Sequence, residues 1–112
     1  MSPLDLVEGQ FAAYNARDLD RFLSFFSDDI RVMRPPAGEA VLTGKEAFAA
    51  FYRDQRFNHT SLRAELLNRI VLGNKVFDHE LIHGVLDEPI EMVAVFEIED
   101  GLIRTVMGFA PV

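Results

Sequence analysis

The sequence has 112 residues, with 18 acidic and 11 basic side chains, a net charge of −7 and no cysteine. A chain of this length can bury one core, so we expect residues 1–112 to form a single domain. The lack of cysteine excludes disulfides and thiolate chemistry, and the acidic charge argues against nucleic acid and anionic membranes as partners.

The first third of the chain shows the residue spacing of helices. A Ser-Pro pair beginning at Ser2 marks a helix start, and apolar residues then recur at helical spacing. Asp18 can cap a second, shorter helix whose apolar stripe extends to Phe26. The capping-box pattern that begins at Thr43 predicts a third helix, and residues 30–34 predict a short strand before it.

The rest of the chain changes from helical spacing to alternation. Four segments are predicted strands: residues 61–72, 75–85, 89–99 and 102–110. Gly73-Asn74 and Asp100-Gly101 are typical of two-residue hairpin turns. Three helices followed by an antiparallel meander predict an α+β fold.

One face of this sheet is predicted to remain uncovered by the helices. In residues 90–99 the even-numbered side chains are all apolar, so we expect that face to meet the helices. The opposite face is only partly polar, because Val93, Val95 and Ile82 interrupt its charges. Exposed apolar strips on sheets mark interfaces, so we predict a homodimer through this face.

The N-terminus and the hydropathy pattern predict a cytoplasmic protein. The first residues carry an acid at Asp5 and lack the basic and apolar segments of a secretory signal. The longest unbroken apolar run, residues 47–52, is far too short to span a membrane.

Two motifs and the order of elements carry a family resemblance. Residues 14–20, Tyr-Asn-Ala-Arg-Asp-Leu-Asp, lead into residues 25–29, Phe-Phe-Ser-Asp-Asp. Together they resemble the SnoaL-like domains of the nuclear transport factor 2-like superfamily, and residues 70–80 resemble a steroid isomerase-like subgroup of it. The resemblance implies a cone, also called cystatin-like: a curved antiparallel or mixed sheet wrapped around three N-terminal helices, with a pocket between them, usually as a dimer.

The same resemblance allows the ketosteroid isomerase machinery to be compared residue by residue. The position of the catalytic tyrosine falls on Gln10, that of the general-base aspartate on Arg34, and that of the protonated aspartic acid on Ala94. All three acid–base groups are therefore replaced, and the resemblance does not imply steroid isomerase activity for this sequence.

The strand over residues 75–85 carries two histidines four positions apart. The resemblance implies that alternate side chains enter the pocket: Phe77, His79, Leu81 and His83 inward, Asp78 and Glu80 outward. His79 would then be a candidate catalytic acid or base, because imidazole titrates near neutral pH. The alternative is a histidine hydrogen-bonded in the core or placed near the dimer face. Along a strand His79 and His83 lie roughly 13 Å apart, so we predict no metal site from them.

Arg34 is the second candidate functional residue. An inward guanidinium could bind a carboxylate or phosphate, whereas the alternative is a surface arginine paired with Glu39. Tyr14 and Tyr52 bring hydroxyls to otherwise apolar helix faces, and the remaining aromatic side chains are predicted to be core. The predicted ligand-binding residues are Tyr14, Arg34, Tyr52, His79, His83, Met107 and Phe109.

These features predict a protein that binds a small apolar or carbonyl-bearing molecule in the cone, without a cofactor. If the protein is an enzyme, proton transfer on a carbonyl compound, as in isomerases, cyclases or hydratases, is the expected chemistry. The alternative is a non-catalytic binding or dimerisation module whose pocket is filled by side chains. A third possibility is a protein-binding adaptor. An open cavity would favour the first function, and a cone filled with phenylalanines the second.

Overall fold

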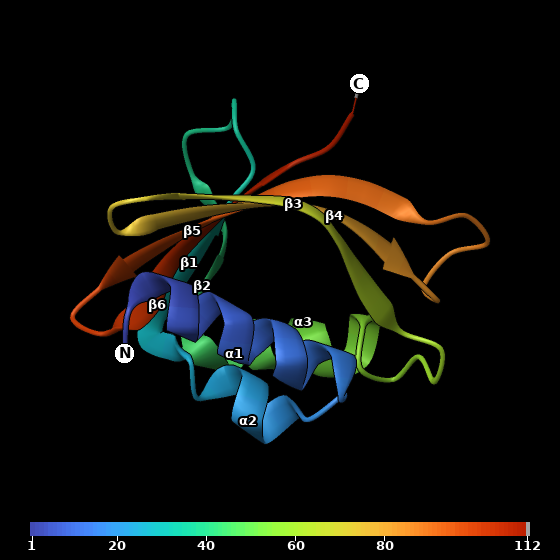
Figure 1. The fold of residues 1–112 in the computed structure, drawn as a ribbon. Helices are drawn as coiled ribbons and strands as arrows, with labels where there is room; N and C mark the ends of the chain where they lie inside the picture. Colours follow the sequence, from blue (N-terminus) through green and yellow to red (C-terminus); the bar gives the residue numbers. More distant parts are fainter. Residues whose placement is uncertain (112) are drawn as a thin grey trace.

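A computed structural model describes residues 1–111, in which three helices lie under a curved six-stranded sheet (Figure 1). The helices are α1 (Pro3–Asn15), α2 (Leu19–Leu23) and α3 (Lys45–Gln55), and the strands are β1 (Phe26–Met33), β2 (Ala40–Thr43), β3 (Arg63–Leu72), β4 (Lys75–His83), β5 (Ile90–Glu99) and β6 (Leu102–Phe109). The strand order is β2-β1-β6-β5-β4-β3, with β1 and β6 parallel and the other neighbours antiparallel. The predicted α+β cone with a mixed sheet is confirmed.

The first two helices begin where their capping residues predict. The Ser2 hydroxyl accepts a hydrogen bond from the Asp5 backbone N–H at 3.1 Å, and the Asp5 carboxylate accepts one from the Ser2 N–H at 3.1 Å. The Asp18 carboxylate accepts from the backbone N–H of Arg21 at 3.1 Å. These bonds satisfy N–H groups that the first turn of a helix leaves without partners. None of the described helices is long and apolar enough to cross a membrane.

The third helix begins differently from its prediction. Thr43 is the last residue of β2 and pairs with Arg31 of β1, so its side chain does not cap α3. Gly44 is the N-cap instead, with a φ of 89° and no side-chain hydrogen bond. The predicted capping box is therefore wrong, because the strand holds Thr43 and the chain turns into the helix at a glycine.

The region between α2 and α3 contains more strand than predicted. β1 begins at Phe26, four residues before the predicted strand, and β2 has no counterpart among the predicted elements. Phe26 pairs with Ile103 of β6, which gives it a strand backbone although its spacing fits the α2 stripe. Its ring is buried, with its centroid 4.8 Å from that of Phe22 and 4.7 Å from that of Phe48. Burial of the ring was predictable, but the pairing with a strand at the other end of the chain was not.

The four predicted strands of the meander are present, with ends that differ by one or two residues. Asp100 and Gly101 have φ values of 53° and 78°, as a tight hairpin turn requires. β4 ends at His83 because Gly84 packs against a backbone: a Cβ there would lie 2.1 Å from the Ser61 carbonyl oxygen. With a φ of 88° as well, Gly84 occupies a place that other residues do not fit.

The side chains of β5 that face the helices are the predicted ones, whereas those of β4 are not. Paired residues share a face of the sheet, and Asp78 pairs with Ala94 while Glu80 pairs with Met92. Ala94 is buried and Met92 packs against the core, so both acids of β4 face the helices. The predicted orientation of β4 is therefore wrong by one residue, which reverses the face of every side chain on the strand.

Candidate functional site

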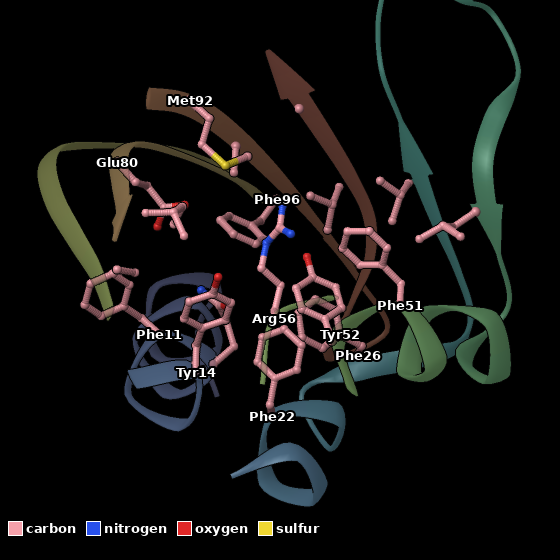
Figure 2. Close-up of a pocket in the computed structure, with 18 of the residues that line it drawn as sticks. Phe11, Tyr14, Phe22, Phe26, Phe51, Tyr52, Arg56, Glu80, Met92 and Phe96 are labelled. Carbon is pink, nitrogen blue, oxygen red and sulfur yellow. The ribbon is translucent and has the colours of Figure 1, made fainter. Parts of the chain in front are cut away.

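The helices and the concave face of the sheet enclose a cavity of about 320 Å³ (Figure 2). This volume is at the lower end of the range of small-molecule sites. Most of the lining is aromatic or aliphatic and comes from α1, α3 and the inner face of the sheet. Its polar members are Gln10, Tyr14, Arg34, Tyr52, Arg56 and Glu80. The phenylalanine side chains therefore do not fill the cone.

Glu80 brings a buried carboxyl group from β4 into this cavity. Glu80 is only 7% exposed, and Figure 2 shows its side chain projecting from the sheet beside Met92. Burial and, to a smaller extent, the nearby Asp78 raise the pKa of Glu80 to about 8, although Arg69 acts in the opposite direction. Within residues 1–111 no hydrogen bond to the carboxyl offsets these effects. At neutral pH the group is mostly protonated and can donate its proton to a ligand.

The cation nearest to Glu80 is held by another carboxylate. Asp78 is fully buried and accepts two hydrogen bonds from Arg69, at 2.7 Å from Nε and 2.9 Å from Nη2. The same guanidinium lies 3.9 Å from Glu8 and 5.8 Å from the centre of the Phe11 ring, where α1 crosses the sheet. Because Asp78 occupies the planar fork of Arg69, Glu80 has no ion pair within the part of the chain that the structure describes.

Two tyrosine hydroxyls face the acid from the helical side. Figure 2 shows Tyr14 of α1 and Tyr52 of α3 pointing toward the sheet. Burial raises the pKa of Tyr52 to about 12, with Arg56 lowering it and Glu80 raising it. Burial also raises the pKa of Tyr14 well above its ordinary value, with contributions from Tyr52 and Glu80. Both hydroxyls stay protonated and can donate hydrogen bonds into the cavity.

Arg56 is a site residue that the sequence reasoning missed. It directly follows α3, four positions after Tyr52, and its guanidinium lies 5.1 Å from the centre of the Phe51 ring. One nitrogen donates to the Gln55 carbonyl oxygen at 2.9 Å. Figure 2 shows the rest of the group beside Tyr52 in the cavity. The i,i+4 spacing from Tyr52 was the signal that could have revealed it.

The two histidines lie on the convex face, outside the cavity. His79 Nε2 is 2.8 Å from a carboxylate oxygen of Glu91, and His83 Nε2 is 2.9 Å from one of Glu65. They share a face, as predicted, but the predicted placement of both in the pocket is wrong because β4 has the opposite orientation. Among residues 1–111 no three histidine or carboxylate side chains gather as a metal site would require.

The remaining predicted ligand-binding residues divide between the two faces. Tyr14, Arg34 and Tyr52 line the cavity, and their role toward a ligand stays a prediction. Met107 and Phe109 do not, because Val106 and Gly108 are the inward residues of β6. Met107 instead pairs with Val95 and Phe109 with Val93 on the convex face, so their predicted placement is wrong.

The three positions compared with ketosteroid isomerase all face the cavity. Gln10, Arg34 and Ala94 contribute an amide, a guanidinium and a methyl group to its wall. The Gln10 amide donates to the Val7 carbonyl oxygen at 3.0 Å, within α1. The site is therefore in the place that the resemblance implies, whereas its acid is Glu80 of β4 and lies at a different position.

Comparisons with known proteins show the family and the fold. The family model described as SnoaL-like domain matches residues 7–106. An uncharacterised cystatin-fold protein from Novosphingobium aromaticivorans is 27% identical, with a TM-score of 0.83 over 96% of this chain and 97% of that one. A putative polyketide cyclase from Pseudomonas putida is 25% identical, with a TM-score of 0.76 over 100% and 93%.

A third structure resembles the chain in fold alone. The putative ketosteroid isomerase from Kribbella flavida is 21% identical, with a TM-score of 0.82 over 96% of this chain and 76% of that one. No curated protein matches the chain by sequence. The cone fold is thus shared widely, while the acid, the hydroxyls and the guanidinium in the cavity must be interpreted from this chain itself.

Proposed function

Because the chain belongs to the family of SnoaL-like domains, we propose that it binds a small, largely apolar carbonyl compound in the cavity and transfers a proton on it through Glu80. The observation that carries this proposal is a buried carboxyl group, without an ion pair, facing an apolar cavity. Similarity to a putative polyketide cyclase supports chemistry on carbonyl compounds. A cytoplasmic location stays a prediction from the sequence.

The polar groups of the cavity favour a ligand that accepts hydrogen bonds. At neutral pH the Tyr14 and Tyr52 hydroxyls, the Arg56 guanidinium and the protonated Glu80 carboxyl are all donors. A carbonyl oxygen offers two acceptor lone pairs and no donor, and the aromatic walls suit an apolar body.

The proposed reaction needs only one acid–base group. Glu80 donates its proton to the carbonyl oxygen, and the resulting carboxylate removes a proton from the adjacent carbon. An O–H bond forms, a C–H bond breaks and Glu80 is protonated again, so the product is the enol. Return of a proton to another carbon of a conjugated system would give an isomerisation. The Tyr14 hydroxyl lines the same cavity as the acid and would donate a hydrogen bond to the oxygen while its charge changes.

The binding part of the proposal can be tested by filling the cavity. Ala94 is buried and lines it, so Ala94→Phe is expected to weaken binding of β-naphthyl methyl ketone by about tenfold or more. Ala12→Phe is the matched control, because Ala12 is on the exposed side of α1. Dissociation constants measured by fluorescence titration, with melting curves as a check of folding, give the comparison. Equal binding by Ala94→Phe and wild type would place the ketone elsewhere.

The alternative of a pocket filled by side chains has less support, because the aromatic residues leave a cavity of about 320 Å³. A non-catalytic binding protein would bind the ketone without exchanging its protons, and this difference distinguishes it from the proposed enzyme. The adaptor function has only the fold in its favour.

We also propose that the protein forms a homodimer through the convex face of the sheet. Register partners on all six strands form one apolar row across this face: Ile70, Phe77, Val95, Met107, Met33 and Ala40. Ile70 is 57% exposed, and Phe109 beside the row is 42% exposed. A second copy presents the same row, so two such faces are complementary by symmetry.

The dimer is expected to dissociate when the row receives a charge. Phe77→Glu is expected to convert a dimer into a monomer, because pairing would bury an unpaired carboxylate from each copy. Leu86→Glu is the control, since Leu86 is exposed in the loop before β5. Light scattering coupled to size-exclusion chromatography gives the mass. A monomeric wild type at micromolar concentration would contradict the proposal.

A further inference from the structure

The unpaired charges of the cavity are both positive. Arg34 and Arg56 line it, and among residues 1–111 no carboxylate is in ion-pair contact with either guanidinium. By contrast, Arg69 is paired with Asp78 and Glu8, and Arg104 with Asp29 and Glu99. Arg17, Arg21, Arg31 and Arg63 also have no ion pair among residues 1–111, but they are exposed to water and do not line the cavity. Arg34 and Arg56 are the cations that a ligand in the cavity can reach.

The surroundings of Arg56 are suited to an anion that is partly removed from water. The guanidinium lies over the Phe51 ring at 5.1 Å and next to Tyr52, whose pKa it lowers. Arg34 also lowers the pKa of Tyr52, so both cations act on the same hydroxyl. A planar guanidinium and a neighbouring hydroxyl donor match the two oxygens of a carboxylate.

Among residues 1–111, Glu80 is the acid that lines the cavity, and it forms no ion pair with Arg56. Figure 2 shows Glu80 near Tyr14 and Phe11, and Arg56 between Tyr14 and Tyr52. A ligand can present its reacting carbonyl to Glu80 and a different group to Arg56.

From these contacts we infer that the ligand is an apolar carboxylic acid whose carboxylate is held by Arg56, with Arg34 and the Tyr52 hydroxyl as further donors. The inference rests on the proposed function, because it names the class of molecule that the same cavity binds. It adds a specificity-determining residue, Arg56, on the side of the cavity next to Tyr52. Carboxylates with an aromatic or aliphatic body thus bind in preference to neutral molecules of the same shape.

The test compares two probes that differ only in charge, β-naphthoate and β-naphthamide. At about pH 6.5 Glu80 is protonated, because its pKa is about 8, and the wild type is expected to bind naphthoate about tenfold more tightly than naphthamide. Arg56→Gln is expected to reduce this ratio to about threefold or less, chiefly by weakening naphthoate binding. A melting curve reports that the variant is folded.

Two further variants separate the local effect from the general charge of the chain. Arg56→Lys keeps the charge but loses the planar fork, and it is expected to retain part of the preference for naphthoate. Arg21→Gln removes a cation from the exposed surface of α2 and is expected to leave the ratio at its wild-type value. An equal fall of the ratio in Arg21→Gln and Arg56→Gln would overturn the inference.

The outcomes also distinguish this inference from the proposed function. Equal binding of naphthoate and naphthamide by the wild type would overturn the carboxylate inference alone and leave the cavity as a binding site for neutral compounds. Failure of both probes and of the naphthyl ketone to bind would overturn both proposals. Loss of naphthoate preference in an Arg56→Gln variant that melts like the wild type would support both.

Discussion

Replacing Glu80 by glutamine is expected to slow the protein-catalysed exchange of the methyl protons of β-naphthyl methyl ketone for deuterium by about 100-fold or more. Glutamine keeps the size of the side chain and its ability to donate a hydrogen bond, but it has no acidic proton to give and no carboxylate to take one. Proton NMR in deuterated buffer follows the loss of the methyl signal, with the rate in buffer alone subtracted.

The control variant is Glu88→Gln, because Glu88 is exposed in the loop before β5 and does not line the cavity. It is expected to exchange the ketone protons at the wild-type rate, and both variants are expected to bind the ketone as the wild type does. Full exchange activity in Glu80→Gln, or an equal loss in Glu88→Gln, would contradict the assigned role.

The pH profile gives a second measurement on the same carboxyl. The proposed first step needs protonated Glu80, so exchange is expected to decline as the pH rises through about 8, the pKa of Glu80. The charged groups that face this carboxyl are Asp78 on its own strand and Arg69 on β3, with Tyr14 and Tyr52 opposite on α1 and α3. Both tyrosines have raised pKa values, so their ionisation does not cause a decline at this pH.

Stability reports the same titration without any ligand. The pKa of Glu80 rises from 4.5 to about 8 on folding, so the folded protein binds this proton more tightly than the unfolded chain. The contribution of this proton to the free energy of unfolding is complete below about pH 4.5 and is lost as the pH rises through about 8. The free energy of unfolding of Glu80→Gln, measured with urea, is expected to lack this decline.

Much of the fold could be predicted because its signals are local. Ser2 and Asp18 satisfy helix N–H groups within three residues of themselves, and the Asp100-Gly101 turn depends on two adjacent backbone conformations. β2 and the start of β1 were missed because they depend on long-range pairing: Phe26 joins the sheet through Ile103, at the far end of the chain. Local spacing cannot reveal such a contact.

The site was harder to predict because it depends on which face of β4 is buried. The Gly73-Asn74 turn pairs Leu72 with Lys75 and therefore Arg69 with Asp78, a pairing that the sequence alone allows. The turn does not indicate which face of β4 is buried. Counting apolar residues over residues 75–85 favours the face that the structure exposes. The structure buries Asp78 because Arg69 pairs with it, and Glu80 because its carboxyl can stay neutral.

Removing the charge of Asp78 is expected to destabilise the protein by about 3–5 kcal/mol, because it leaves the Arg69 guanidinium in a largely buried place without its carboxylate. Asp78 is fully buried and the Arg69 side chain is 14% exposed, so water cannot replace the lost partner. Asp78→Asn keeps the size of the side chain and thus isolates the charge. Urea unfolding at neutral pH measures the difference in free energy.

The matched control and a double variant show whether the loss comes from the pair. Asp29→Asn removes a carboxylate 2.8 Å from Arg104 on the exposed surface, where solvent screens the charge, and a much smaller loss is expected. Asp78→Leu with Arg69→Met removes both buried charges and is expected to recover most of the stability. Equal losses for Asp78→Asn and Asp29→Asn would mean that burial does not strengthen the Arg69 pair.

The same Asp78→Asn variant links the structural pair to the proposed chemistry. Without the Asp78 carboxylate, Arg69 loses its closest anionic partner, and the negative charge of Asp78 no longer raises the pKa of Glu80. Both changes lower the pKa of Glu80, so the decline of ketone exchange is expected to move to lower pH. A buried ion pair that keeps its neighbour protonated would explain why two acids stand together on the inner face of a strand, where apolar residues would give greater stability.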